Sequence, residues 1–255
     1  VAYPVGPLDK GVANVVGIVL TYSRLTVGLS AAAFMTRAVR EAKQYAEFRD
    51  AFGVTIGRFP MVAGQLAAMD HAAKRTTAGA FKLYRDFLTL EGGLKGGLDT
   101  GESEAAWRKR FVIRELIMLQ KLAASWDCTD VIRAAMSIFG GHGVMEDFSC
   151  LPRLYRDSAV NELWEGPRNV LLTQIFRDLQ RVKDRYAPAV FVRDLLAGLE
   201  EDVVAPLAAE AEALLAHPHL FGMDAATLDV CRRWDAFCHS LTHAYQDLAF
   251  KDVEG

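Results

Sequence analysis

The sequence predicts an all-α protein, and three observations carry that prediction. Alternating apolar and polar residues, which mark half-buried strands, are scarce along the chain. Long stretches rich in Ala and Leu repeat their apolar residues at helical spacing instead. Helix breakers are few, with 8 Pro and 20 Gly among 255 residues. Because 51% of the residues are hydrophobic and 24% are charged, the chain has ample material for a core and does not have a disordered composition.

Two long helices are expected in the first part of the chain. The first runs from about Asn14 to Asp50, with Gly53 as its terminator. The second begins near Pro60, because Pro suits the first turn of a helix. The glycine-rich stretch 92–101 then follows, but the consecutive Gly, Lys and Ser or Thr of a phosphate-binding loop do not come after it. We therefore interpret it as a flexible connection between helices.

A third long helix is expected from about Ser103 to Phe139, with a break near Trp126 to Asp130. The other expected helices are a short one at about 151–157, one from about 167, and two or three amphipathic ones beyond 188, the last from about 224 to 250. The residues of 158–166 are expected to form a loop.

The charge of the chain is unevenly distributed. The net charge is −3, but residues 1–182 carry 23 basic and 19 acidic side chains, whereas residues 183–255 carry 6 basic and 13 acidic ones. Nucleic-acid binding needs a basic surface, so this balance and the acidic tail argue against a nucleic-acid partner. The shift in composition also marks 183–255 as a separate segment.

The sequence gives little support for a metal site, a disulfide framework or a membrane span. Four cysteines without a CxxC pair form neither a disulfide scaffold nor a zinc site. His239 and His243 lie one helical turn apart, a spacing that can bind a metal, but without an HExxH context we interpret them as surface or core histidines and expect no metal. The apolar stretch from Val12 to Met35 is cut by Asn14 and Arg24 and falls short of a membrane span. We expect a cytoplasmic protein without a membrane partner.

Three motifs stand out by their order and spacing. They are YAEFRDAFGVTIGRFP at 45–60, IFGGHGVMED at 138–147 and LPRLYRDSAVNELWEGPRNV at 151–170. Together they resemble the C-terminal half of the acyl-CoA dehydrogenase family, which typically shows R-x-x-FG, then GGxGY, then RLYRD followed by an aromatic residue, Glu, Gly and Thr. The resemblance covers about residues 10–182.

This resemblance implies an organisation for the chain. Residues 11–182 would form an up-and-down helical bundle, residues 1–10 would be the end of an upstream β-domain, and residues 183–255 would be an extra acidic helical segment packed on the bundle. The family also has an N-terminal helical domain and a β-domain, which supply much of the flavin and acyl sites. We therefore expect a C-terminal part of a longer flavoprotein, inactive by itself.

The family's chemistry is α,β-dehydrogenation of an acyl-CoA thioester, in which a glutamate takes the α-proton and hydride passes to flavin N5. The resemblance places that base at Glu165, beside Trp164. A carboxylate in an apolar, water-poor site keeps its proton to higher pH, which suits a general base. Some relatives carry the base on the first long helix, but the corresponding residue is Ser23. Arg24 and Gly166 then match positions close to the substrate.

The resemblance also assigns FAD contacts. Arg49 and Phe52 match residues that reach the cofactor of a neighbouring subunit, and a planar guanidinium suits a pyrophosphate. Gly140 and Gly141 match a turn close to the cofactor, where a Cβ would obstruct approach. Trp164 is the aromatic residue of the flavin-side loop.

Two departures from the family pattern leave an alternative open. Pro167 stands where a Thr hydroxyl helps to hold the flavin, and Val144 stands where Tyr is usual. These changes, with the NV ending of the third motif, are closest to the alkylation-response branch, which resembles isovaleryl-CoA dehydrogenase. The alternative is thus a non-catalytic or weakly active stress-response flavoprotein, whose helical domain serves oligomerisation or nucleic-acid binding.

The family's partners complete the expectation. An acyl-CoA would be the substrate in fatty acid metabolism, an electron-transfer flavoprotein would accept the electrons, and the bundle would form a homodimer or homotetramer.

Overall fold

The computed structural model describes residues 3, 4, 6–91, 93 and 101–254 of the chain, and over them the all-α prediction is confirmed. The helices are α1 (Gly11–Asn14), the π-helical segment η2 (Val15–Val19), α2 (Leu20–Phe48), α3 (Pro60–Leu88), α4 (Glu104–Phe139), α5 (Leu151–Leu163), α6 (Arg168–Val182), α7 (Pro188–Leu195), α8 (Glu201–Leu215) and α9 (Ala225–Glu254). Short 3-10 turns lie at Leu8–Lys10, Ile56–Arg58 and Gly140–Val144 (η4). Most of the glycine-rich stretch predicted to be a flexible connection lies outside the described residues.

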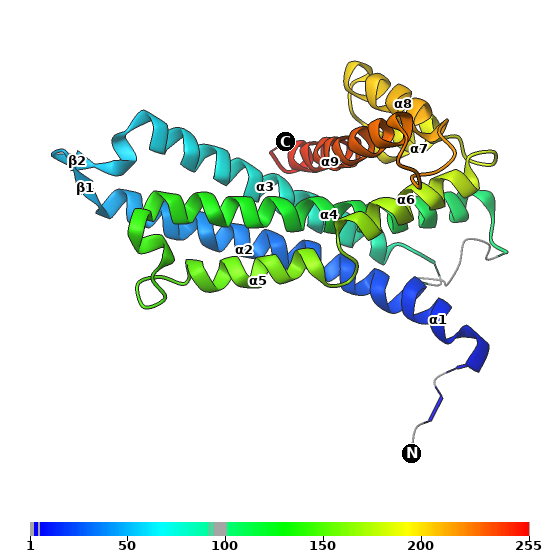
Figure 1. The fold of residues 1–255 in the computed structure, drawn as a ribbon, viewed down its shortest axis with the longest axis horizontal. Coiled ribbons are helices and arrows are strands. Elements are labelled where there is room, and N and C mark those ends of the chain that lie inside the picture. The colour runs from blue at the N-terminus through cyan, green and yellow to red at the C-terminus, as the bar shows by residue number, and fades with distance from the viewer. Residues whose placement is uncertain (1–2, 5, 92, 94–100, 255) are drawn as a thin grey trace.

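Four helices lie side by side as a long bundle (Figure 1). α2 packs against α3, α4 and α5, and its face toward them is built from small residues. Ala31, Ala38, Ala42 and Ala46 are fully buried, so neighbouring helices approach closely. At one end of the bundle the chain turns through a two-stranded ribbon, β1 (Asp50–Ala51) and β2 (Val54–Thr55), before α3 begins.

The helix that contains α2 begins earlier than predicted. α1, η2 and α2 continue into one another from Gly11 to Phe48, and by length and composition alone this helix could cross a membrane. Only 39% of its most apolar stretch is buried. By length and composition, the prediction that this stretch falls short of a membrane span is therefore wrong. The second half of the helix is the central helix of the bundle, and core helices of soluble proteins can have the same length and composition.

Two predicted breaks are absent from the structure. α4 runs without interruption through Trp126–Asp130, because Cys128 and Ile132 sit on its buried face. α5 continues to Leu163 instead of ending at Asp157, since Ser158 is buried and its hydroxyl donates to the carbonyl of Tyr155. The predicted loop is therefore confined to the residues after Leu163.

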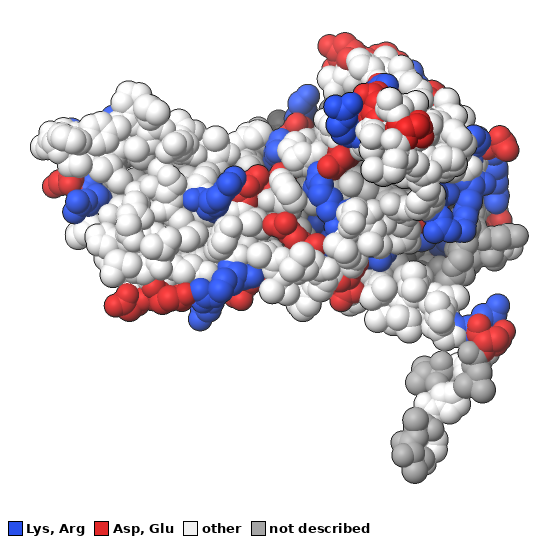
Figure 2. Space-filling view, in the orientation of Figure 1, with Lys and Arg blue, Asp and Glu red and all other residues white. Residues whose placement is uncertain are grey.

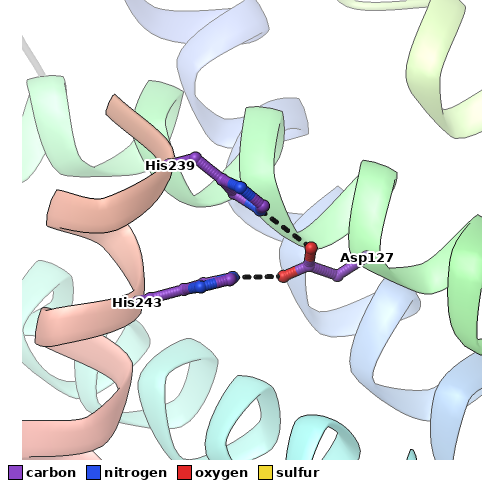
Figure 3. Close-up of side chains that lie close together, drawn as sticks. All are labelled: Asp127, His239 and His243. Carbon is purple, nitrogen blue, oxygen red and sulfur yellow. Dashed lines mark hydrogen bonds and ion pairs between the residues drawn. The ribbon is translucent and has the colours of Figure 1, made fainter. Parts of the chain in front are cut away.

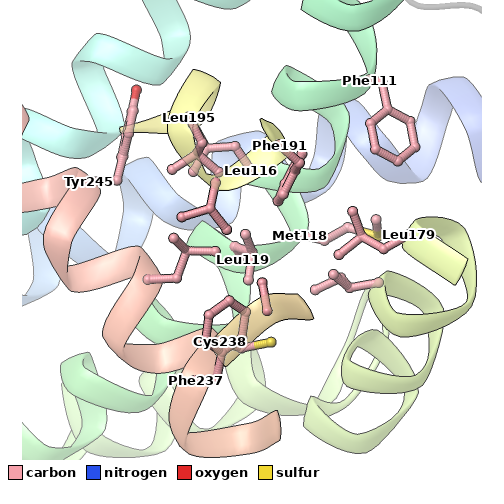
Figure 4. Close-up of a cluster of buried hydrophobic side chains, with 14 of the residues drawn as sticks. Phe111, Leu116, Met118, Leu119, Leu179, Phe191, Leu195, Phe237, Cys238 and Tyr245 are labelled. Atoms are coloured by element: carbon pink, nitrogen blue, oxygen red, sulfur yellow. The ribbon is translucent and has the colours of Figure 1, made fainter. Parts of the chain in front are cut away.

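The last three helices cover one end of the bundle. α9 packs against α3, α4 and α8, and α7 packs against α8 (Figure 1). They share a core with the bundle, in which aromatic and aliphatic side chains of α4, α6, α7 and α9 meet (Figure 4). Its members include Phe111 and Leu119 from α4, Leu179 from α6, Phe191 from α7 and Phe237 from α9. Residues 183–254 are thus held to the bundle by apolar burial.

Candidate active site

The third motif places Glu165 in the short loop between α5 and α6, residues 164–167, which we call the Glu165 loop. Glu165 has φ 58° and Gly166 has φ 100°, so both adopt left-handed backbone conformations. Gly takes such a conformation without strain, whereas for Glu it is uncommon and is found where the surroundings impose it. The conformation of Glu165 therefore needs external support.

Two buried cations supply that support. The Nε of Arg24, on α2, donates to the carbonyl oxygen of Glu165 at 2.8 Å. The Nζ of Lys121, on α4, donates to the carbonyl oxygen of Gly166 at 2.7 Å and to that of Glu162 at 3.1 Å. The position of the Glu165 loop is therefore fixed by two core helices.

The side chain of Glu165 is left available. Its Oε2 is buried and has no hydrogen-bond partner among the described residues. A buried carboxylate oxygen without a partner is costly to a fold, and such atoms call for an explanation from function. Trp164, its predicted aromatic neighbour, is 52% exposed and so leaves an apolar ring at the protein surface.

The cations of the site are affected by their burial. Burial lowers the pKa of Lys121 to about 8, and nearby Arg24 contributes to the same shift, while Glu162 and Glu165 oppose it. Burial also lowers the pKa of Arg24, helped by Arg114 and opposed by Glu165. Arginine remains charged under these conditions, so Arg24 is a permanent positive charge beside the Glu165 loop.

A cleft opens along α6, the helix that begins directly after this loop. It has a volume of about 1010 Å³ and lies between α6 and the N-terminal part of the first long helix. Val12 and Val16 provide apolar walls, and Asn169 lies two residues after the loop. Arg114, Arg177 and Arg181 provide positive charge, against the acidic side chains of Asp9 and Asp178. The cleft could take a ligand that is apolar in one part and anionic in another.

The remaining predicted residues gather at the other end of the bundle. Arg49 follows the last turn of α2, and Phe52 lies in the ribbon turn with 99% of its surface exposed. Gly140 and Gly141 follow the last turn of α4, and a Cβ built on either would meet nothing within 4 Å. These four residues present open surface.

The second motif also has a structural role. A Cβ on Gly143 would lie 2.2 Å from the carbonyl oxygen of Met136, so glycine is required for this turn. The ring of Tyr45 stacks on Phe139 with centroids 4.2 Å apart, and its hydroxyl lies 3.3 Å from Nδ1 of His142. The ends of α2 and α4 are therefore joined here.

The structure thus divides the predicted residues into two groups. Arg24, Glu165 and Gly166 come together, with Trp164 beside them. Arg49 lies roughly 37 Å from Arg24, at 1.5 Å per helical residue along α2. Sequence reasoning missed Lys121, although a lysine inside the apolar run IMLQKLAAS is a signal of a buried, partnered cation.

Comparison with known proteins identifies the family of the chain. The family model described as "Acyl-CoA dehydrogenase, C-terminal domain" matches residues 9–180. The chain belongs to the acyl-CoA dehydrogenase family. The predicted resemblance is therefore confirmed.

Two curated relatives show the same relationship. Acyl-CoA dehydrogenase family member 11 of Caenorhabditis elegans is 28% identical over 177 residues, covering 69% of this chain and 27% of the relative. The putative acyl-CoA dehydrogenase AidB of Escherichia coli is 28% identical over 159 residues, covering 62% of this chain and 27% of the relative. The similarity to AidB is consistent with the predicted branch. The chain spans about a quarter of the length of these relatives.

The fold recurs in solved structures of the family. An acyl-CoA dehydrogenase from Bacillus anthracis, complexed with FAD, superposes with a TM-score of 0.70 at 20% identity. The match covers 98% of this chain and 44% of that one, so α7, α8 and α9 are included in the similarity.

Proposed function

We propose that this chain is the helical part of an FAD-dependent acyl-CoA dehydrogenase in which Glu165 is the catalytic base. The observation that carries the proposal is the Glu165 loop itself. Its backbone is fixed by Arg24 and Lys121, while the Oε2 of Glu165 is buried and has no partner among the described residues. A fixed carboxylate with an available oxygen is what abstraction of a proton requires.

The residues present fit FAD as the cofactor. Gly140 and Gly141 leave open backbone, Arg49 offers a guanidinium at the surface, and the ring of Phe52 is almost fully exposed. FAD, when bound, supplies the hydride acceptor of the reaction. Arg49 and Phe52 would hold it by charge and by ring contact, and Trp164 would border it beside Glu165.

The proposal includes self-association. Arg49 and Phe52 lie at the far end of α2 from Glu165, so one copy of the chain does not bring the two groups to one FAD. A second copy that brings its Arg49 and Phe52 to the Glu165 loop of the first would complete the site. A homodimer is the smallest assembly that does this, and a homotetramer contains it.

The cleft beside α6 would take the acyl-CoA. Val12 and Val16 suit an apolar chain, and Arg177 and Arg181 suit the phosphates of coenzyme A. Arg24 and Gly166 would border the reacting thioester, because Arg24 donates to the carbonyl of Glu165 and Gly166 follows Glu165 in the loop. An electron-transfer flavoprotein, the acceptor that the family uses, would reoxidise the flavin.

A second candidate is favoured by one observation. Pro167 precedes α6 and has neither hydroxyl nor N–H, so it cannot offer the flavin the contact of a Thr side chain. Loss of this side-chain contact to the flavin is compatible with the stress-response alternative, a flavoprotein of weak or no dehydrogenase activity.

Anaerobic titration of the purified full-length protein with a series of acyl-CoAs tests the proposal. We expect the visible flavin band to bleach with at least one acyl-CoA. Glu165→Gln should retain the flavin and lose the bleaching, because the amide cannot accept the proton. Glu200→Gln, an exposed residue at the start of α8, serves as the control and should bleach normally.

The other outcomes separate the alternatives. A flavin band that no acyl-CoA bleaches would favour the stress-response candidate. Absence of any flavin would refute both and leave a helical scaffold.

A further inference from the structure

Two histidines of α9 and one aspartate of α4 converge on a single point (Figure 3). The Nε2 of His239 lies 2.8 Å from Oδ1 of Asp127, and the Nε2 of His243 lies 2.7 Å from Oδ2. The ligand-type atoms of the three side chains lie within 4.8 Å of one another. Their convergence is a product of folding, since Asp127 is more than 100 positions from both histidines in the sequence.

We infer that Asp127, His239 and His243 form a binding site for a divalent transition metal of the zinc class. Two imidazole nitrogens and one carboxylate oxygen are a ligand set that suits Zn²⁺, with a fourth position left for water. Ligands about 2.1 Å from such an ion stand about 3.4 Å apart. In the present arrangement each Nε2 donates a hydrogen bond to Asp127. An ion can bind only when these two hydrogen bonds break and each imidazole holds its proton on Nδ1, which leaves Nε2 free to ligate.

The surroundings allow an ion to enter. The side chains of His239 and His243 are 29% and 25% exposed, while that of Asp127 is 12% exposed. A cavity of about 820 Å³ borders His243 and provides a route from solvent.

Arg75, on α3, is the group that opposes metal binding. Its Nη2 lies 2.9 Å from Nε2 of His243 and 4.0 Å from Asp127. A guanidinium at this distance repels a cation and competes for the same imidazole. Arg75 also lies 3.8 Å from Asp247, so it keeps an acidic neighbour if an ion displaces it from His243. Arg75 thus sets the affinity of the site.

A bound ion would join α9 to α4 and so fasten the C-terminal helices to the bundle. This role is independent of the proposed dehydrogenase chemistry, because none of the three metal ligands belongs to the Glu165 loop. Metal binding that contributes to the folded state should raise the melting temperature.

The test is titration of the metal-free full-length protein with Zn²⁺ by calorimetry and with Co²⁺ by visible absorption, which reports tetrahedral coordination. We expect one equivalent to bind and the melting temperature to rise. Asp127→Asn and His243→Gln should each weaken binding at least about 10-fold. Arg75→Met should strengthen it at least about 10-fold, because it removes the opposing charge.

The other histidines provide the control. His217 and His219, in the loop before α9, have rings 5.7 Å apart and could bind metal adventitiously. The double variant His217→Gln/His219→Gln should bind Zn²⁺ as the wild type does. The inference is overturned if no equivalent binds at micromolar Zn²⁺, if binding survives Asp127→Asn and His243→Gln, or if it is lost in the His217/His219 double variant. If a ligand variant fails to fold, Arg75→Met still provides a test. A Zn²⁺ affinity of Arg75→Met equal to that of the wild type would also refute the site.

Discussion

At the scale of single residues, the backbone of Glu165 is held by side chains from distant parts of the sequence. Arg24 donates to the carbonyl of Glu165, and Lys121 donates to the carbonyls of Glu162 and Gly166. Both residues lie on helices that also contribute side chains to the hydrophobic core. This arrangement leaves Oε2 of Glu165 without a hydrogen-bond partner among the described residues. It also makes the left-handed conformation of Glu165 depend on those two cations.

Replacement of Arg24 by Gln should therefore disturb stability and chemistry together. A buried carbonyl loses its charged donor, so we expect the free energy of unfolding to fall by about 1–3 kcal/mol. Flavin reduction by substrate should slow at least about 10-fold, because the base loses its fixed position. Urea unfolding and anaerobic stopped-flow absorbance measure the two effects. The matched control is Arg40→Gln, an exposed arginine of the same helix, which should lie within about 0.5 kcal/mol of wild type.

Lys121 gives a prediction about pH. Its pKa is about 8 in the folded protein against 10.5 ordinarily, so between these values the unfolded chain binds more protons and stability rises with pH. Relative to Lys121→Met, the unfolding free energy of the wild type should increase by about 2 kcal/mol between pH 7.5 and pH 9.5. Urea unfolding of both proteins at the two pH values provides the measurement. A difference that does not change with pH would contradict the assignment of a buried, charged lysine.

At the scale of elements, α9 is an integral part of the core. Leu241 is 1% exposed and belongs to the same apolar cluster as the buried residues of α4. The burial of Trp234, whose Nε1 donates to the carbonyl of Leu172 on α6, ties α9 to a further helix. The helices beyond residue 183 should therefore unfold with the bundle.

Leu241→Ala tests that expectation. The cavity it leaves should lower the free energy of unfolding by about 2–5 kcal/mol. Leu228→Ala, on the same helix but 42% exposed, should change it by less than about 1 kcal/mol. Circular dichroism melts should show one transition for each variant. Two separate transitions would mean that α9 is not part of the cooperative unit.

At the scale of the whole molecule, large apolar side chains are exposed at the end that carries β1 and β2. Phe48, Phe52 and Met61, at this end, are at least 80% exposed. On the face drawn in Figure 2, fewer charged side chains lie over this end than around α6 to α9, where both signs of charge gather. Large apolar side chains exposed together mark surfaces that associate.

Self-association through this end has a simple test. Phe52→Asp, combined with Met61→Asp, should reduce the mass measured by analytical ultracentrifugation to that of a smaller assembly. FAD should be lost in parallel, because the proposed site draws Phe52 from a second copy. Phe221→Asp, 65% exposed but at the other end of the molecule, should leave the mass unchanged. An unaltered mass in the Phe52/Met61 variant would refute this interface.

The sequence allowed the helices to be predicted for local reasons, and it allowed Glu165 to be singled out through the resemblance of the third motif to a family. Pro60 marks where α3 begins, and the periodic apolar residues mark the helices. Gly53 does not terminate the first long helix, which ends at Phe48, because the chain forms the strands β1 and β2 there and Gly53 lies in their turn. The false break near Trp126 arose because that polar stretch of α4 is stabilised by contacts with other helices. Lys121 beneath the Glu165 loop, and Asp127 facing His239 and His243, depend on pairings across 40 to more than 100 residues. Periodicity and spacing carry no information about such pairings.

The continuity of α2 limits how this protein can change. Arg24 contacts the Glu165 loop near one end of that helix, and Tyr45 stacks on Phe139 near the other. Inserting or deleting one residue between them would rotate one contact against the other by about 100° and shift it by about 1.5 Å. Substitutions can accumulate on the exposed side of α2, but the number of residues between Arg24 and Tyr45 must stay the same. Length variation among related chains should instead collect in loops such as 216–224.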